Sequence, residues 1–377
     1  MTDKRSNSKG AILEEVLRAY FLRAGFFVVR GVPFRCEGED LTDIDLWLYE
    51  RPTGTSRRVQ ICDIKYKQRP KAIERILWTS GLVDAINVDG AYVATTDKRK
   101  NLRAIADKLN IQLIDGIDIQ SIQSNSNVLY ANRISDEQLI AGLQSVDKAF
   151  RNKDLQDARI SILTSLSEGF GSMSVVRSLD DFVRLARTVI TYQPNSEAAR
   201  SGGRLAYLAA AITCQSLDFV SVGAGFQTLE KRRDLILKSI KFGALADSNQ
   251  LVIQSALALV EKYAPNGRGT AIAIRNKLHQ ELDKIPADIV ADEAVRLLKV
   301  NQLFTTGCEL EMAGYHSCLP TFDNLNMHTK SMLGSLLDYA GVNRERFANA
   351  WTSDYTMVRP GTVEDEHAKT IFQKELF

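Results

Sequence analysis

The sequence predicts an α/β domain followed by an all-α domain. Up to about residue 116, amphipathic helical segments and short apolar segments follow one another in the order α-β-β-β-α-β-α-β, which is typical of one mixed sheet flanked by helices. A polar stretch rich in Ser and Asn covers residues 121–132, and beyond it Ala-, Leu- and Ile-rich segments with helical spacing dominate. We therefore expect an N-terminal domain over 1–122, a linker over 123–135 and a helical domain over 136–377.

Composition supports two soluble domains. The chain has 377 residues, 45% of them hydrophobic and 25% charged, as in ordinary globular proteins. It has no apolar run of about 18 residues and no apolar segment after its charged start, so we expect neither a membrane span nor a signal peptide. Five scattered cysteines suit reduced thiols in the cytoplasm. The net charge of +2 indicates no particular partner.

The elements of the first domain follow from spacing and turn residues. Apolar residues recur every three or four positions from Ile12 to Phe21, and Gly25 ends that helix. Gly31-Val32-Pro33 is expected to interrupt the first strand, and Arg51 to Thr55 is a turn that joins the next two strands as a hairpin. The expected elements are a helix over 9–24, strands over 26–30, 43–49 and 59–67, a helix over 71–88, a strand over 91–96, a helix over 99–110 and a strand over 111–114.

The second domain is expected to be helical throughout, with Gly or Pro in most of the breaks. The sequence contains no repeat of fixed period, so we do not expect a solenoid. The expected helices cover roughly 136–150, 154–168, 179–191, 203–216, 225–241, 247–263, 269–283, 288–303 and 329–340.

Charged residues in the strand over 59–67 are the main functional signal. Side chains alternate between the faces of a strand, so Asp63, Lys65 and Lys67 share the face opposite Cys62 and Ile64. An acid and a base within an apolar strand are costly to bury unless they are paired or hold a metal. The bland alternative is a surface ion pair on an edge strand.

Two further acids precede this strand in the sequence. Asp45 lies in the preceding strand, on the face opposite Ile44, Leu46 and Leu48, and Glu14 lies in the first turns of the first helix. Carboxylates hold hard cations such as Mg²⁺, which lowers the pKa of a bound water and polarises a phosphate. The sequence therefore predicts a metal-dependent phosphodiesterase site with Asp45, Asp63 and the backbone carbonyl of Ile64 as ligands and Lys65 beside the attacking water.

Two assignments within this site stay open. Glu14 could reach the metal directly or through a water, or it could simply favour the N-terminus of its helix. Asp43 lies on the same face as Asp45 and could be the ligand in its place.

Basic residues gather next to the predicted acids. Seven basic and two acidic side chains lie between Arg57 and Arg75, which suits a bound polyanion, although a solvated strand end and helix start is the simpler reading. The candidate nucleic-acid contacts are Lys67, Arg69 and Lys71.

The order of these motifs resembles the PD-(D/E)XK nuclease superfamily, and within it the Mrr-type restriction endonucleases. The matching residues are Gly10 and Glu14 of the first helix, Gly25-Phe26-Phe27-Val28, Asp45, Gln60, Asp63-Ile64-Lys65, the strand that ends in Thr95-Thr96, and the segment 111–116. The resemblance covers about the first third of the chain. One departure from the family pattern is that no Pro stands directly before Asp45.

This resemblance implies a restriction-endonuclease-like fold that cleaves DNA with Mg²⁺ or Mn²⁺, with Glu14, Asp45, Asp63 and Lys65 in the active site. It implies a role in restriction or antiviral defence, and paired cutting of duplex DNA would make a homodimer natural. The alternative is a catalytically inactive nuclease fold that binds DNA or acts as a scaffold, with its helical domain contacting a partner protein. DNA and RNA substrates are not distinguished by the sequence.

Overall fold

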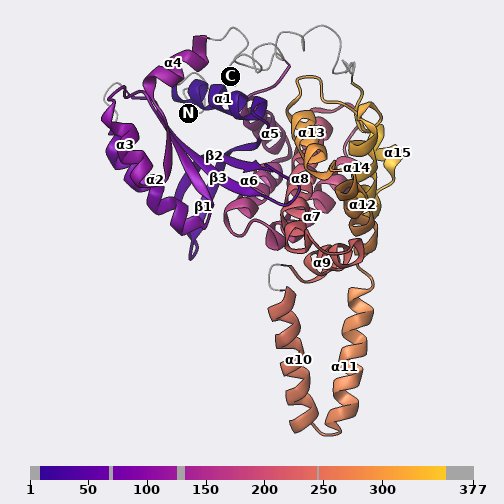
Figure 1. Cartoon of the computed structure of the whole chain (residues 1–377). Helices are drawn as coiled ribbons and strands as arrows, with labels where there is room; N and C mark the ends of the chain where they lie inside the picture. The colour runs from indigo at the N-terminus through magenta and orange to yellow at the C-terminus, as the bar shows by residue number, and fades with distance from the viewer. Residues whose placement is uncertain (1–8, 68–70, 125–131, 244–245, 354–377) are drawn as a thin grey trace.

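The computed structural model describes residues 9–67, 71–124, 132–243 and 246–353, except for the side chains of 246–250. The N-terminal part is built on a five-stranded mixed sheet, and the remainder is mostly helical. Figure 1 shows the sheet with its helices on one side of the molecule and the helical part on the other. The coarse prediction of an α/β part followed by a helical part is confirmed.

The sheet has the order β1-β2-β3-β4-β5. β1, β2 and β3 pair antiparallel, whereas β3, β4 and β5 pair parallel. The parallel connections run through helices, as parallel neighbours require. The elements of this part are α1 (Lys9–Arg23), β1 (Phe27–Cys36), β2 (Glu39–Glu50), β3 (Arg58–Lys65), α2 (Ala72–Ile86), β4 (Gly90–Thr95), α3 (Asn101–Lys108), β5 (Ile111–Ile114) and α4 (Gly116–Ser124).

The first strand differs from the prediction. β1 runs on through Gly31-Val32-Pro33 to Cys36 instead of ending there. Gly31 has φ +66°, which a glycine adopts readily, and Pro33 is tolerated because β1 is an edge strand of the sheet. In the neighbouring strand β2, side chains do not keep to the predicted faces. Ile44 belongs to a different apolar cluster from Leu46 and Leu48, whereas the prediction placed all three on one face.

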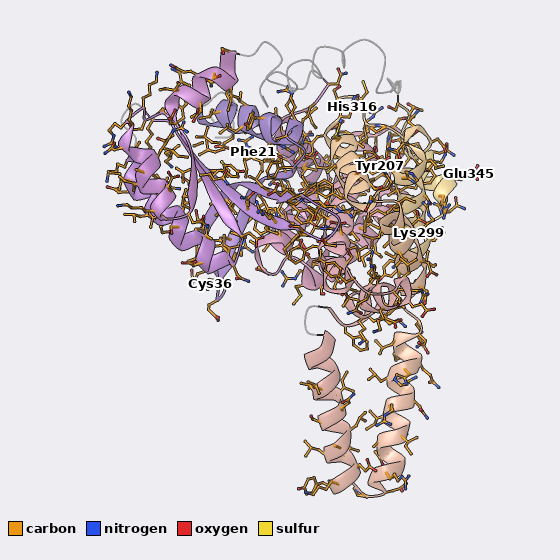
Figure 2. The ribbon with its side chains drawn as sticks, in the orientation of Figure 1. Phe21, Cys36, Tyr207, Lys299, His316 and Glu345 are labelled. Atoms are coloured by element: carbon orange, nitrogen blue, oxygen red, sulfur yellow. The ribbon has the colours of Figure 1, made fainter. Side chains whose placement is uncertain are left out.

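Each face of the sheet buries its own set of side chains. On one face, Leu13 and Phe21 of α1 pack with Leu46 and Cys62 of the strands. The other face shares a continuous apolar core with the helical part, where the Tyr49 ring lies 5.1 Å from that of Phe170. Figure 2 marks the two interiors by Phe21 and Tyr207, both buried. The predicted domain boundaries stay a prediction, and residues 125–131 of the linker lie outside the described residues.

Most helices of the helical part overlap predicted ones, but α13 and the short α15 were not predicted. Helix α13, which contains Thr305-Thr306-Gly307, was not predicted because these residues favour helices weakly. Gly307 instead gives close contact with Gln215 of α8, so packing overrides propensity. The elements are α5 (Asp136–Phe150), α6 (Asp154–Ser167), α7 (Ser172–Val189), α8 (Glu197–Val220), η1 (Ser221–Ala224), α9 (Leu229–Phe242), α10 (Ala246–Tyr263), α11 (Gly267–Leu282), α12 (Ala287–Lys299), α13 (Leu303–Tyr315), η3 (Phe322–Asn324), α14 (Met327–Tyr339) and α15 (Arg344–Ala348).

Helix α8 forms the centre of the helical part, while α10 and α11 form a hairpin that projects from the body (Figure 1). Among the described residues, the segment Glu197–Ala224 is long and apolar enough to cross a membrane, but 83% of its most apolar window is buried inside the protein. This segment therefore packs as a core helix of the helical part.

Candidate active site

The candidate site lies where β2 and β3 separate. The last paired residues of these strands are Leu46 and Cys62, so Asp45 and Asp63 are the next residues on each strand. Beyond this point β3 stays paired with β4 as far as Lys65. The Ile64 N–H donates to Asp45 Oδ2 at 2.6 Å, so the Asp45 side chain links the two strands where their backbone pairing ends. Two acids from neighbouring strands thus meet at one break in the sheet.

Helix α2 supplies a residue that the sequence did not single out. Arg75 Nε donates to Asp63 Oδ2 at 2.9 Å, and its Nη2 pairs with Asp63 Oδ1, so the guanidinium grips both oxygens of the carboxylate. Asp63 is 8% exposed, which makes this pairing necessary for an ionised side chain. The sequence places Arg75 only in the basic cluster over 57–75, because its contact with β3 depends on how α2 packs.

Electrostatics link the members of the site. Burial raises the pKa of Asp45 to about 6, and the charge of Glu14 adds to the effect. The Ile64 N–H, Arg75 and Lys65 act in the opposite direction. The structure thus places the predicted Glu14 and Lys65, together with Arg75, close enough for their charges to act on Asp45. A carboxylate with a pKa near neutrality in such a cluster is a mark of functional sites.

Lys65 stands at the end of β3 and is partly buried. Within the described ranges its ammonium group forms no hydrogen bond or ion pair, although its charge acts on Asp45. Its ammonium group is therefore free to meet a ligand. The carbonyl of Ile64, predicted as a further ligand, belongs to the same strand end, and its role stays a prediction.

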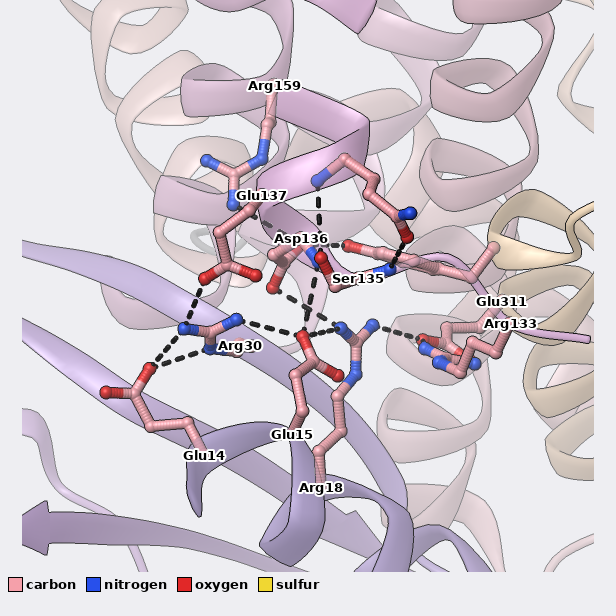
Figure 3. A network of polar contacts seen from close by, with 12 residues as sticks. Glu14, Glu15, Arg18, Arg30, Arg133, Ser135, Asp136, Glu137, Arg159 and Glu311 are labelled. Atoms are coloured by element: carbon pink, nitrogen blue, oxygen red, sulfur yellow. Dashed lines mark hydrogen bonds and ion pairs between the residues drawn. The ribbon is translucent and has the colours of Figure 1, made fainter. Parts of the chain in front are cut away.

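Glu14 extends the site toward the helical part. Its Oε2 accepts from Arg30 Nε at 2.7 Å, and Arg30 also pairs with Glu15 at 2.9 Å and Glu137 at 2.7 Å. Burial raises the pKa of Glu14, while Arg30 lowers it. Glu14 is thus both a neighbour of Asp45 and a member of the ion network drawn in Figure 3.

The rest of that network attaches α1 to the helical part. Arg18, 1% exposed, donates to Asp136 at 3.3 Å and to Glu311 at 2.8 Å, and Tyr315 Oη donates to Asp136 at 2.6 Å. These residues come from α1, α5 and α13 (Figure 3). Acids and arginines alternate, so each buried charge has a partner of opposite sign. The network fixes the helix that carries Glu14.

The other predicted residues lie at the margin of the site. Lys67 is exposed, and its carbonyl accepts from Thr96 Oγ1 at 2.6 Å. Lys71 is exposed and pairs with Glu74 at 2.9 Å, whereas Arg69 lies outside the described residues. Asp43 is exposed and pairs with Pro33 across β1 and β2, so Asp45 is the acid next to the opening.

The chemistry of the donors suits a hard divalent cation, but the present arrangement is closed. Among the described residues, no group of three His, Cys, Asp or Glu side chains is arranged to hold a metal ion. Arg75 occupies the oxygens of Asp63, and Asp45 accepts from Ile64. Binding a cation between these acids requires Arg75 to release Asp63.

Comparisons with known proteins identify no relative. No model of a known protein family matches the chain. No curated protein and no solved structure matches it either.

Proposed function

We propose that this protein is a Mg²⁺- or Mn²⁺-dependent endodeoxyribonuclease with a restriction-endonuclease-like PD-(D/E)XK domain. The observation that supports it best is the separation of β2 and β3 at Asp45 and Asp63, with Lys65 two residues further on. The restriction or antiviral role follows from the resemblance alone, and the cytoplasmic location is proposed from the scattered cysteines.

Each residue would have a distinct part in the cleavage. Asp45, Asp63 and the Ile64 carbonyl would hold the cation, which when bound lowers the pKa of a water and polarises the phosphate. The Lys65 ammonium would orient the attacking water and stabilise the charge that develops on the phosphate. Arg75, once it releases Asp63, has the planar fork that binds two phosphate oxygens.

Incubation of the purified full-length protein with supercoiled plasmid, single-stranded DNA and RNA tests this function. We expect the plasmid to be nicked or linearised with Mg²⁺ or Mn²⁺ and to stay intact with EDTA. Cleavage of RNA but not DNA would change the substrate class, and cleavage that persists in EDTA would refute the metal-dependent mechanism. Light scattering, with and without DNA, tests the homodimer that paired cutting favours.

A second candidate function is supported by the grip of Arg75 on Asp63. In this alternative, the fold binds DNA or serves as a scaffold without catalysis, and the helical part contacts a partner protein. In a domain without catalysis, Asp63 need not bind a metal, so its two oxygens can stay paired with Arg75. Calorimetry with Mn²⁺ separates the two: heat of binding that disappears in Asp63→Asn supports the enzyme, and no binding together with no cleavage supports the scaffold.

A further inference from the structure

A cavity lies at the opposite end of the β2–β3 hairpin from the candidate active site. Its volume is about 520 Å³. The hairpin turn, the segment that leads into α9 and the end of α12 enclose it. The lining residues are Arg51, Gly54, Thr55, Arg57, Ser221, Gly225, Gln227, Thr228, Leu229, Arg232, Leu298, Lys299 and Asn301.

The lining is strongly basic. It contains three arginines and one lysine but no Asp or Glu. The carboxylate of Asp218, which is fully buried, pairs with Arg57 through Nη2 at 2.9 Å and with Arg51 at 3.5 Å. The same carboxylate also accepts from Tyr49 Oη at 2.7 Å. One acid therefore serves two guanidiniums.

The other two cations have no acidic partner among the described residues. Arg232 donates from Nε to the Ala224 carbonyl at 3.1 Å and also to the Gly225 carbonyl, which fixes its position without neutralising it. Lys299, at the end of α12, is exposed and forms no ion pair within the described ranges; it is labelled in Figure 2. The cavity thus carries four positive charges against one negative charge.

The positive charges that line the cavity are close enough to repel one another. The pKa of Arg51 is lowered by burial, and the charges of Arg57 and Arg232 lower it further. The side chains of Arg51 and Arg57 are 10% and 3% exposed, so water screens this repulsion poorly. An anion within the cavity would relieve the repulsion.

Helix α9 adds to the positive potential. Its N-terminus, capped by Thr228, lines the cavity, and the Thr228 side chain accepts from the Lys231 N–H. The helix has 14 residues, and the first amides of a helix of this length favour an anion. The basic side chains and the helix end therefore point to the same kind of ligand.

We propose that this cavity binds a small molecule that carries two or more phosphate groups. Four cations at one site match a polyphosphate better than a single charge, and guanidiniums bind phosphate oxygens in pairs. The volume is within the range of roughly 300–1,000 Å³ that is usual for small-ligand pockets. Walls from three separate elements favour a small molecule over the backbone of a duplex.

The cavity is separate from the candidate active site. Arg57 and Asp63 are six positions apart in extended chain, which corresponds to about 20 Å along the strand. The ligand would hold the hairpin turn against α9 and α12, so it would join the sheet to the helical part. The inference does not depend on the proposed nuclease function, because no residue is shared by the two sites.

Isothermal titration of the full-length protein with tripolyphosphate and a nucleoside triphosphate tests the proposal. Citrate serves as a polyanion without phosphate. We expect binding of both phosphate compounds that weakens with added salt, and at least tenfold weaker binding of citrate. Tighter binding of the nucleotide would identify a nucleotide as the source of the phosphates, and equal binding would identify the polyphosphate chain itself.

Two substitutions and a matched control assign the binding to the cavity. Lys299→Gln alters an exposed side chain and is expected to weaken tripolyphosphate binding about fivefold, and Lys299→Gln with Arg232→Gln at least twentyfold. Lys108→Gln, an exposed lysine of α3, should leave binding unchanged. Thermal unfolding of each variant checks that it is folded.

Three results would overturn the proposal. They are no binding of phosphate compounds at millimolar concentration, equal loss of binding in Lys108→Gln and Lys299→Gln, or citrate binding as tightly as tripolyphosphate. Binding of a DNA duplex that is tighter than that of the small compounds, and that Lys299→Gln weakens, would show instead that the cavity contacts nucleic acid.

Discussion

The two ends of strand β3 bury charge in opposite ways. Just before its first residue, Arg57 lines the basic cavity, where it shares the carboxylate of Asp218 with Arg51. At its end, Asp63 lies beside Asp45, whose carboxylate is raised in pKa to about 6 by burial. The basic end has an excess of positive charge, which is costly within a folded chain and suits an anionic ligand. At the acidic end Arg75 and Lys65 balance the two acids, and a cation could bind there only after Arg75 releases Asp63. In the ion network of Figure 3, by contrast, acids and arginines pair with one another, and the network attaches α1 to the helical part.

Removal of the amine at the acidic end should have the largest effect. We expect Lys65→Ala to lower the rate of plasmid nicking at least thousandfold, about 4 kcal/mol of transition-state stabilisation, without changing the folded state. Lys108→Ala, at an exposed position of α3, is the matched control and should keep full activity. Equal activity of both variants would remove Lys65 from the site.

Removal of the acid at the basic end should destabilise the protein. Asp218→Asn leaves Arg51 and Arg57 without a charged partner, so we expect the free energy of unfolding to fall by about 3–5 kcal/mol. Denaturant unfolding measures the change, and Asp292→Asn, which affects an exposed pair with Arg233, should cost less than about 1 kcal/mol. A similar decrease in the free energy of unfolding in the two variants would mean that Arg51 and Arg57 do not need the charge of Asp218.

The same change of Asp to Asn at the acidic end should raise the free energy of unfolding instead of lowering it. Asn keeps an oxygen for the Ile64 N–H and removes the buried charge, so Asp45→Asn should raise the free energy of unfolding by about 1–3 kcal/mol at pH 7.5. The pKa of Asp45 is about 6 when folded and 3.8 ordinarily, so the wild type loses stability as the pH rises through this window. The advantage of the variant should therefore vanish below about pH 4. An advantage that is independent of pH would exclude the titration of Asp45 as its cause.

Metal binding should follow the same titration and gives the smallest effect. Only the ionised carboxylate is a ligand, so the affinity for Mn²⁺ should be about tenfold weaker at pH 5 than at pH 7 and should level off above a pKa of about 6. Calorimetry at several pH values measures the dependence. A constant affinity over this range would mean that Asp45 does not bind the ion.

Local patterns in the sequence predicted that Asp45 and Asp63 lie together on neighbouring strands, but not that Arg75 pairs with Asp63. Alternation along 59–67 placed Cys62 and Ile64 in one apolar cluster, as found, because strand geometry is a local property. The grip of Arg75 on Asp63 depends on how α2 packs over β3, which no spacing encodes. Helix α13 was missed for a similar reason, because packing against α8 compensates for weak propensity.

The basic cavity could not have been predicted from the sequence. Its cations come from the hairpin turn, the start of α9 and the end of α12, segments that are up to about 250 residues apart, as the bond between Arg51 and Asn301 illustrates. Only Arg57 belonged to the basic cluster noted in the sequence. Charge patterns show their function only when folding brings the residues together.

The most direct test of the central claim compares two neighbouring acids of β2. We expect Asp45→Asn to lower the Mn²⁺-dependent rate of plasmid nicking at least thousandfold, because Asp45 lies at the opening next to Asp63. Asp43→Asn, two residues away and exposed, should keep a rate within about twofold of the wild type. Equal rates in the two variants, or loss only in Asp43→Asn, would contradict the assignment of the active site to the break between β2 and β3.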